Sequence, residues 1–276
     1  MGTLYLVATP IGNLEDITAR ALRILREAHL IAAEDTRQTR KLLTHFDIHT
    51  PITSYHEHNK DSKLLQVVAA LQSGDVALVS DAGTPALNDP GYELVLAALN
   101  AGYIVSPIPG PSAPVAALVA SGLPTDAFLY LGYLPRKTSD RRRLLEQIVG
   151  LPYTLIFLEA PHRLLAALQD LEEVLGDRQS AVGRELTKLH EEIVRGNLSA
   201  ARTHFTAQPP RGEFTLIVAG APPDEKERWP EERVIAVLQE HLGRGESASR
   251  MAQAVSAQAG WSRREVYQLS LSLNRS

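Results

Sequence analysis

The 276-residue chain contains no cysteine. This absence excludes disulfides, thiolate zinc sites and a cysteine nucleophile, and it fits a protein that works in a reducing compartment. No apolar run approaches the roughly 20 residues that a membrane helix needs. The N-terminus also lacks the basic flank and the long apolar stretch of a secretory signal. We therefore expect a cytoplasmic protein that does not span a membrane.

An excess of positive charge is also missing, because the formal net charge is −4. The chain as a whole is not attracted to nucleic acid, so any contact with RNA must come from local clusters of arginine and lysine. Hydrophobic residues make up 44% of the chain, which is enough to bury a core. The length suggests two domains or slightly more.

Strand and helix patterns alternate along the first half. A continuous apolar run at residues 4–8 is typical of a buried strand, and apolar residues then recur at helical spacing between Ile17 and Ala28. Similar strand patterns, each followed by a helical pattern, occur at 30–33, 52–55, 76–80 and 104–105. Such alternation predicts a parallel sheet with helices on both faces. We expect residues 1–122 to form an N-terminal α/β domain.

The second half predicts a further α/β domain, at residues 123–221, and a helical appendage, at residues 231–276. Strand patterns occur at 128–131, 155–158, 181–184, 192–195 and 214–218, and helical patterns at 140–149, 164–175 and 198–204. A linker rich in proline and charge at 220–230 precedes three helical patterns. Ser262 and Glu265 have the spacing of a capping box at the start of the last helix.

Three loops rich in proline and glycine follow predicted strands, at residues 8–13, 80–91 and 107–113. The carboxyl ends of parallel strands form the sheet edge where ligands bind, so these loops are candidates for one pocket. An ordinary strand-to-helix turn has the same composition. Neither G-x-G-x-x-G nor G-x-x-x-x-G-K-[ST] occurs, which disfavours a nucleotide held by its phosphates. An adenosine-containing ligand without phosphate remains open.

Eight short motifs carry a resemblance to a known family. In order, they are VATPIGNLEDIT, AEDTR, YHEHN, DAGTPALNDPG, PIPGPSA, GYLPRK, EAPHR and GRELTKLHEE. Between Leu4 and Ala219 the chain resembles the ribosomal RNA small subunit methyltransferase I family, of the tetrapyrrole-methylase superfamily. The helical tail is similar to the helix-turn-helix-like C-terminal domain of that family. One departure is Ala86-Leu87-Asn88, where Leu-Ile-Ser is commoner.

The resemblance implies two α/β domains of the tetrapyrrole-methylase (class III methyltransferase) fold plus a small C-terminal helical domain. It implies S-adenosylmethionine as cofactor, bound in the cleft between the α/β domains, and a homodimer. The implied substrate is a cytidine ribose in the decoding centre of small-subunit (16S) ribosomal RNA, either free or in the assembled small subunit. By position, the residues that match the superfamily's cofactor pocket are Pro10, Ile11, Asp81, Thr84, Ser112, Ala113, Leu158, Leu186 and Phe214.

A ribose 2′-hydroxyl must lose its proton when it accepts a methyl group. The candidate catalytic residues are Lys188, Glu185, Glu34 and Asp35, with Arg37 and Arg184 able to hold a phosphate. Lys188 could hold a phosphate, stabilise a developing alkoxide, or act as base if burial lowers its pKa. Taken singly, an exposed charged residue is more often a solvated surface group than a catalyst.

Two basic clusters suit the backbone of RNA: Arg136 and Lys137 with Arg141, Arg142 and Arg143, and the run of Arg37, Arg40 and Lys41. Basic runs can also be solvated faces. Near the first cluster, we expect Tyr130 and Tyr133 to pack in the core rather than to stack on a base. Trp261 should anchor the core of the helical tail.

His56 and His58 have the i, i+2 spacing that would place both rings on one face of a strand. No third ligand is evident and methyl transfer needs no metal, so we expect a polar strand end and no metal site. His162 is expected at a helix start. Two other functions stay open: methylation of a tetrapyrrole or a protein by the same fold, and a non-catalytic module that binds RNA or cofactor.

Overall fold

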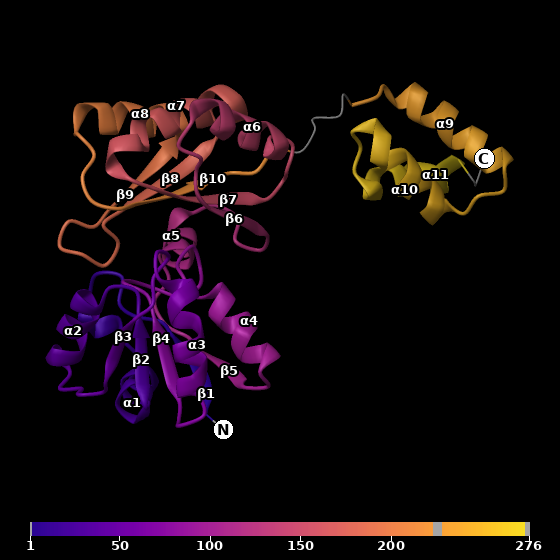
Figure 1. Cartoon of the computed structure of the whole chain (residues 1–276). Coiled ribbons are helices and arrows are strands. Elements are labelled where there is room, and N and C mark those ends of the chain that lie inside the picture. The colour runs from indigo at the N-terminus through magenta and orange to yellow at the C-terminus, as the bar shows by residue number, and fades with distance from the viewer. Residues whose placement is uncertain (1, 223–227, 274–276) are drawn as a thin grey trace. The chain divides into compact units, whose positions relative to one another are not determined.

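The computed structural model describes residues 2–222 and 228–273, and Figure 1 shows its elements. The chain forms two compact units, residues 1–221 and residues 222–276. No helix within the described residues is both long enough and apolar enough to cross a membrane. Residues 223–227 of the predicted linker lie outside the described part of the chain.

The first sheet contains five strands, which are all parallel. In spatial order they are β3 (Ile52–Ser54), β2 (Leu30–Ala33), β4 (Val76–Val79), β1 (Thr3–Val7) and β5 (Ile104–Ile108). The helices between them are α1 (Ala19–Glu27), α2 (Thr36–His45), α3 (Lys60–Ala70) and α4 (Tyr92–Asn100). A short 3-10 helix, η1 (Leu14–Asp16), precedes α1. The parallel sheet predicted from the alternation of patterns is confirmed.

Both faces of this sheet are buried, which explains why its strands read as continuous apolar runs. In β4, Ala77 and Val79 belong to the core that includes Leu25 of α1, whereas Val76 and Leu78 belong to the core on the other face. Neighbouring side chains of a strand point to opposite faces, so a sheet covered by helices on both sides needs apolar residues at every position. All four residues of β4 are buried accordingly.

The second sheet is mixed. Its spatial order is β6 (Phe128–Tyr133), β7 (Thr154–Glu159), β10 (Phe214–Val218), β8 (Gln179–Arg184) and β9 (Glu192–Asn197). Only β6 and β7 pair in parallel, and the other neighbours are antiparallel. The helices of this half are α6 (Thr138–Ile148), α7 (Leu164–Leu175), the short η2 (Pro161–Arg163) and α8 (Leu198–Ala207).

Helix α5 (Ala113–Ser121) connects the two sheets, and Figure 1 shows it lying between them. It follows β5 of the first sheet, yet its Ala117 and Leu118 are buried with Ile156 and Ile217 of the second. The carboxyl edge of the first sheet therefore lies against the second sheet. Gly122 ends α5 with φ 82, at the boundary predicted between the two α/β domains. That residues 1–122 and 123–221 are separate domains stays a prediction.

In the second unit, the described residues form three helices, α9 (Glu231–Gly243), α10 (Ala248–Ala259) and α11 (Arg263–Leu273), around a core of their own. The predicted capping box is confirmed. The backbone N–H of Glu265 donates to Ser262 Oγ at 3.2 Å, and that of Ser262 donates to Glu265 Oε2 at 2.8 Å. Trp261 packs on this core and its Nε1 donates to the carbonyl of Trp229 at 2.8 Å.

Candidate active site

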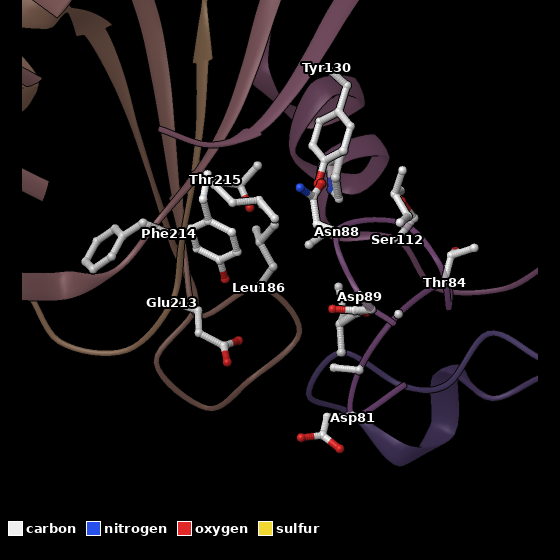
Figure 2. A pocket seen from close by; sticks show the side chains of 18 of the residues that line it. Asp81, Thr84, Asn88, Asp89, Ser112, Tyr130, Leu186, Glu213, Phe214 and Thr215 are labelled. Carbon is white, nitrogen blue, oxygen red and sulfur yellow. The ribbon is translucent and has the colours of Figure 1, made fainter. Parts of the chain in front are cut away.

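A cavity of about 300 Å³ lies where the loops of the first sheet meet the second sheet. Figure 2 shows Leu186, Glu213 and Phe214 on one wall, and Asp81 and Asp89 on the opposite wall. On the first wall, Phe214 begins β10, Glu213 directly precedes it, and Leu186 lies in the loop after β8. Both residues of the other wall follow β4. A volume of this size is at the lower end of the range for small-molecule sites.

Strand pairing brings the loops of the first sheet together. Because β1 and β4 are neighbours, the segments that follow them run side by side, and Thr9 and Gly83 form a bridge. Its two N–H···O bonds measure 2.9 and 3.0 Å. Beyond this bridge, Ala86 and Asn88 have φ of 66° and 65°, a left-handed conformation that costs free energy in residues other than glycine. The loop at 80–91 is therefore held in one strained shape at the cavity.

A glycine in β6 makes room for this loop. Gly132 has φ 64 at an irregularity of the strand register. A Cβ atom at this position would lie 2.2 Å from Nδ2 of Asn88, which lines the cavity. Any larger residue would displace the Asn88 side chain. This contact gives the glycine of the GYLPRK motif a structural reason.

Among the residues that the structure describes, four carboxylates line the cavity, and no arginine, lysine or histidine does. They belong to Glu34, Asp81, Asp89 and Glu213. Burial, together with the charge of Asp89, raises the pKa of Glu34, and burial raises that of Asp89. Backbone N–H groups hold part of the cluster, because Asp35 donates to Asp81 Oδ1 at 2.9 Å and Asp81 donates to Glu34 Oε2 at 3.3 Å. The cavity is therefore suited to a positively charged ligand.

The residues predicted to hold the cofactor come together, with one exception. Those that line the cavity are Ile11, Asp81, Thr84, Ser112, Ala113, Leu158, Leu186 and Phe214. Pro10 does not line it. With Thr9, Lys41 and Ser80 it lines a neighbouring hollow that shares Asp81 with the cavity. These residues lie together as the predicted cofactor site requires, and cofactor binding by them stays a prediction.

Lys188 and Glu185 lie beside the cavity without lining it. The ammonium group of Lys188 is 2.9 Å from Glu185 Oε1 and 2.9 Å from Oε2 of Glu213, which does line the cavity. Burial lowers the pKa of Lys188, but the hydrogen bonds and charges of the two carboxylates raise it by more. Lys188 therefore stays protonated at neutral pH. Lys188 therefore cannot act as the base, but it can still hold a phosphate or stabilise a developing alkoxide.

The loop that carries Lys188 packs against the loop after β1. A Cβ atom at Gly12 would lie 2.4 Å from Cγ of Lys188, so only glycine permits this approach. The backbone N–H of Asn13 donates to Thr187 Oγ1 at 3.1 Å. Glu185 and Thr187 have φ of 48° and 66°. Like the loop at 80–91, this segment keeps a strained backbone next to the cavity, as functional loops often do.

Asp35 and Arg37 neutralise each other. Asp35 accepts from the backbone N–H of Arg37 at 2.8 Å at the start of α2, and its carboxylate is 2.7 Å from the guanidinium of Arg37. The hydrogen bond from the Arg37 side chain, above all, lowers the pKa of Asp35 to about 2. Asp35 is therefore too weak a base to take a proton at neutral pH. The side chain of Arg37 remains 84% exposed and can meet a phosphate.

Sequence reasoning missed several residues that line the cavity. Tyr130 packs against a buried core cluster as expected, but it also lines the cavity. Tyr133 is exposed and lines the cavity, so for this residue the expectation of core packing is wrong. Burial raises the pKa of Tyr130 to about 12, which keeps its hydroxyl a hydrogen-bond donor. Glu213 was missed because it precedes a strand. It reaches this edge only because β10 runs antiparallel to β7 and β8, which no local pattern in the sequence indicates.

The structure corrects the predicted basic cluster of α6. Arg141 is buried and its guanidinium pairs with the equally buried Asp170, so it cannot meet RNA. Carbonyl oxygens and a carboxylate already compensate the charge of this guanidinium inside the protein, so it stays buried. Arg142 is tied to Asp170 at 2.7 Å and to Glu173. Arg136, Lys137 and Arg143 are exposed and remain predicted RNA contacts.

His56 and His58 do not share a strand face, because β3 ends at Ser54. They lie in the following turn, where the backbone N–H of His56 donates to Asn59 Oδ1 at 2.8 Å. Across residues 2–222 and 228–273, no group of three His, Cys, Asp or Glu side chains could hold a metal ion. His162 lies in η2, directly before α7, as expected for a helix start.

Comparisons with known proteins agree with these features. The family model described as Tetrapyrrole (Corrin/Porphyrin) Methylases matches residues 3–202. A Synechocystis protein named "Ribosomal RNA small subunit methyltransferase I" is 49% identical over 99% of this chain and 99% of its own length. A Bacillus subtilis protein of the same name is 44% identical over 97% of this chain and 93% of its own.

Solved structures show a similar fold at low sequence identity. A crystal structure of diphthine synthase has a TM-score of 0.64 and 14% identity, over 79% of this chain and 90% of that one. Uroporphyrin-III-C-methyltransferase from Thermus thermophilus has a TM-score of 0.55 and 22% identity, over 79% of this chain and 94% of that one. With the family match, these likenesses confirm the predicted fold class.

Proposed function

The chain belongs to the ribosomal RNA small subunit methyltransferase I family, and from that premise we propose the reaction that it catalyses. Its cofactor is S-adenosylmethionine, as the motifs predicted. The chain transfers the methyl group of this cofactor to small-subunit ribosomal RNA. The acceptor is the 2′-hydroxyl of a cytidine ribose in the decoding centre. Since ribosomal RNA is the substrate, the enzyme works in the cytoplasm.

The acid-lined cavity is the observation that carries this proposal. When bound, S-adenosylmethionine supplies an electrophilic methyl group on a positively charged sulfur. The four carboxylates favour that charge and the ammonium group of the same molecule, because no cationic side chain in the described part of the chain lines the cavity to oppose them. Ile11, Leu158 and Leu186 add apolar surface for the uncharged parts of the ligand. The residues present therefore fit this cofactor.

The side chains around the cavity divide the remaining tasks. Lys188, held by Glu185 and Glu213, presents a permanent positive charge that can stabilise a developing alkoxide or hold a phosphate of the RNA. Of the candidate proton acceptors named from the sequence, Glu34 is the one that lines the cavity. Its raised pKa brings it closer to that of an effective general base at neutral pH, so we assign it the proton of the 2′-hydroxyl.

A homodimer is part of the proposal, and an exposed apolar surface supports it. We use the term apolar surface for the exposed large side chains on α4, β5, α5 and β6, elements that follow one another in the chain. Its members are Tyr92, Leu96, Leu99, Ile104, Val115, Val119 and Phe128. Both β5 and β6 are edge strands of their sheets. An unprotected sheet edge with exposed apolar side chains near it is a usual place for a second copy to bind.

Val119→Asp should convert the dimer into a monomer in sedimentation equilibrium. Val119 is 70% exposed, so the aspartate removes apolar contact across the interface without disturbing the core. Leu65→Asp is the matched control, because Leu65 is 78% exposed on α3, outside the apolar surface. A parent chain that sediments as a monomer would exclude the homodimer. Equal effects of the two variants would place the interface elsewhere.

A labelled-methyl transfer assay tests the reaction. The acceptors are small ribosomal subunits, free ribosomal RNA and a tetrapyrrole, each supplied without prior methylation. We expect transfer to one of the two RNA acceptors and none to the tetrapyrrole. Mass spectrometry of nuclease digests should then place the methyl group on a cytidine ribose. Transfer to the tetrapyrrole alone would replace the proposal with a metabolic methylase, and binding without any transfer would leave a non-catalytic module.

A further inference from the structure

A second hollow lies next to the acid-lined cavity and has the opposite chemistry. It is an open depression of about 940 Å³ between the segment that follows β6 and the short helix η2. Its basic lining residues are Arg136, Arg141, His162 and Arg163, and no carboxylate within residues 2–222 and 228–273 lines it. Tyr133 lines both hollows and is 54% exposed. We call it the basic depression.

Two arginines give the basic depression a fixed backbone. Arg141 Nη1 donates to the carbonyl oxygens of Pro135 and Arg136, at 3.3 and 3.5 Å. Arg163 donates to the carbonyls of Leu134 and Pro135. Behind the lining, Arg141 is paired with Asp170, and Arg163 is 3.2 Å from buried Glu159. These two guanidiniums are therefore already paired with protein groups, and they hold the segment that carries Arg136 in place.

Arg136 and His162 are the polar groups left for a ligand. Both side chains are exposed, and neither forms an ion pair or side-chain hydrogen bond with any residue that the structure describes. Since Arg136 is not paired and no described carboxylate lines the depression, its surface favours a polyanion. Tyr133, at the border with the cavity, offers an exposed ring on which a base can stack.

We propose that the basic depression binds the ribose–phosphate backbone of the RNA segment next to the methylated nucleotide. This inference rests on the proposed function. Arg136 holds a phosphate, His162 donates a hydrogen bond to the same stretch of backbone, and Tyr133 stacks on the base at the boundary. The target ribose then lies over the acid-lined cavity. Through this arrangement, the exposed part of the GYLPRK motif and His162 of the EAPHR motif acquire one function.

RNA binding by the full chain tests the inference. The probe is an unmethylated transcript of small-subunit ribosomal RNA, and its binding is measured by filter retention between about 50 and 200 mM salt. Arg136→Ala should lower the salt slope by about 0.7 and weaken binding roughly fivefold near 0.1 M salt, the counterion release of one phosphate contact on single-stranded RNA. Adding His162→Ala should weaken binding further. Both variants should raise the KM for RNA while the calorimetric Kd for S-adenosylmethionine stays unchanged.

Two further variants control for charge and folding. Arg136→Lys keeps the charge, so it should restore most of the slope. Arg20→Ala removes an equally exposed arginine on α1, far along the chain from the basic depression, and should leave the slope unchanged. An unchanged slope and KM in the Arg136→Ala, His162→Ala double variant would overturn the inference, as would an equal loss in Arg20→Ala. A parent that binds the transcript but transfers no methyl group to RNA would instead refute the proposed function.

Discussion

The acid-lined cavity and the basic depression share Tyr133 but differ in charge. Counted over the described residues, four carboxylates and no basic residue line the first, whereas four basic residues and no carboxylate line the second. A small cation and a polyanion can therefore bind side by side without competing. The net charge of −4 hides this separation completely. What matters for recognition is the sign of charge at each hollow, not its sum over the chain.

The two hollows also differ in how their charged groups are used. In the cavity, burial raises the pKa of Glu34 and Asp89, so no positive group of the protein fully compensates these two carboxylates. In the basic depression, two of the arginines are compensated by buried Asp170 and Glu159. The first arrangement leaves charge available for a ligand, and the second holds a surface in shape. The following variants test this difference.

The largest effect is expected for Arg141→Ala. It should lower the free energy of unfolding of the first unit by about 3–5 kcal/mol, because Asp170 would lose its buried partner. Urea denaturation followed by circular dichroism measures this change. Both tryptophans, Trp229 and Trp261, lie in the second unit, so their fluorescence provides an internal control. Arg143→Ala, at an exposed position, should change stability by less than about 0.5 kcal/mol. Equal effects of the two variants would show that burial does not set the role of Arg141.

Next in size is the effect of Lys188→Met on methyl transfer. The single-turnover rate at saturating cofactor and RNA should fall by about 10²–10³-fold, the usual cost of removing one group that stabilises a developing negative charge. Methionine keeps most of the length and apolar volume of lysine, so the packing on Gly12 should survive. Calorimetry on the same sample should show unchanged cofactor binding. A rate within a few-fold of the parent would exclude Lys188 from the chemical step.

A smaller effect is expected for Asp81→Ala, measured as cofactor affinity. The Kd for S-adenosylmethionine should rise by about ten- to a hundredfold, because a hydrogen-bonding carboxylate leaves the cavity while no core contact is lost. Asp126→Ala serves as the matched control, since Asp126 is exposed and does not line the cavity. Affinity that is equal in the two variants would remove Asp81 from the site.

The smallest effect is a pH dependence of cofactor affinity that depends on Glu34. A carboxylate attracts a cation only when ionised, and the raised pKa of Glu34 makes it take up a proton at a higher pH than an ordinary carboxyl group. The Kd should therefore rise a few-fold as the pH falls from about 8 to about 5, and Glu34→Gln should flatten this dependence. Asp35, with its pKa near 2, stays ionised throughout and cannot be the cause. Calorimetry at constant ionic strength measures the curve, and an equally steep curve in the variant would assign it to another group.

Local patterns in the sequence were sufficient to predict the parts of the site that follow parallel strands. The loops at 8–13, 80–91 and 107–113 could be found because each comes after a buried strand, and parallel strands end at one edge. Ile11, Asp81 and Ser112 therefore meet at the cavity as expected. Pro10 precedes Ile11 directly, yet it lines the neighbouring hollow, and no pattern distinguishes the two.

The sequence by itself determined the alternation of strands and helices, the parallel first sheet, the capping box of Ser262 and Glu265, and the loops that form one wall of the cavity. These features depend on residues close together in the chain, whose spacing and turn chemistry act locally. Only the tertiary structure decided that Glu213 joins that cavity and that Arg141 is buried. The first depends on the antiparallel direction of β10, and the second on a partner, Asp170, that lies on another helix. Both are decided by contacts between distant segments, which no local pattern encodes.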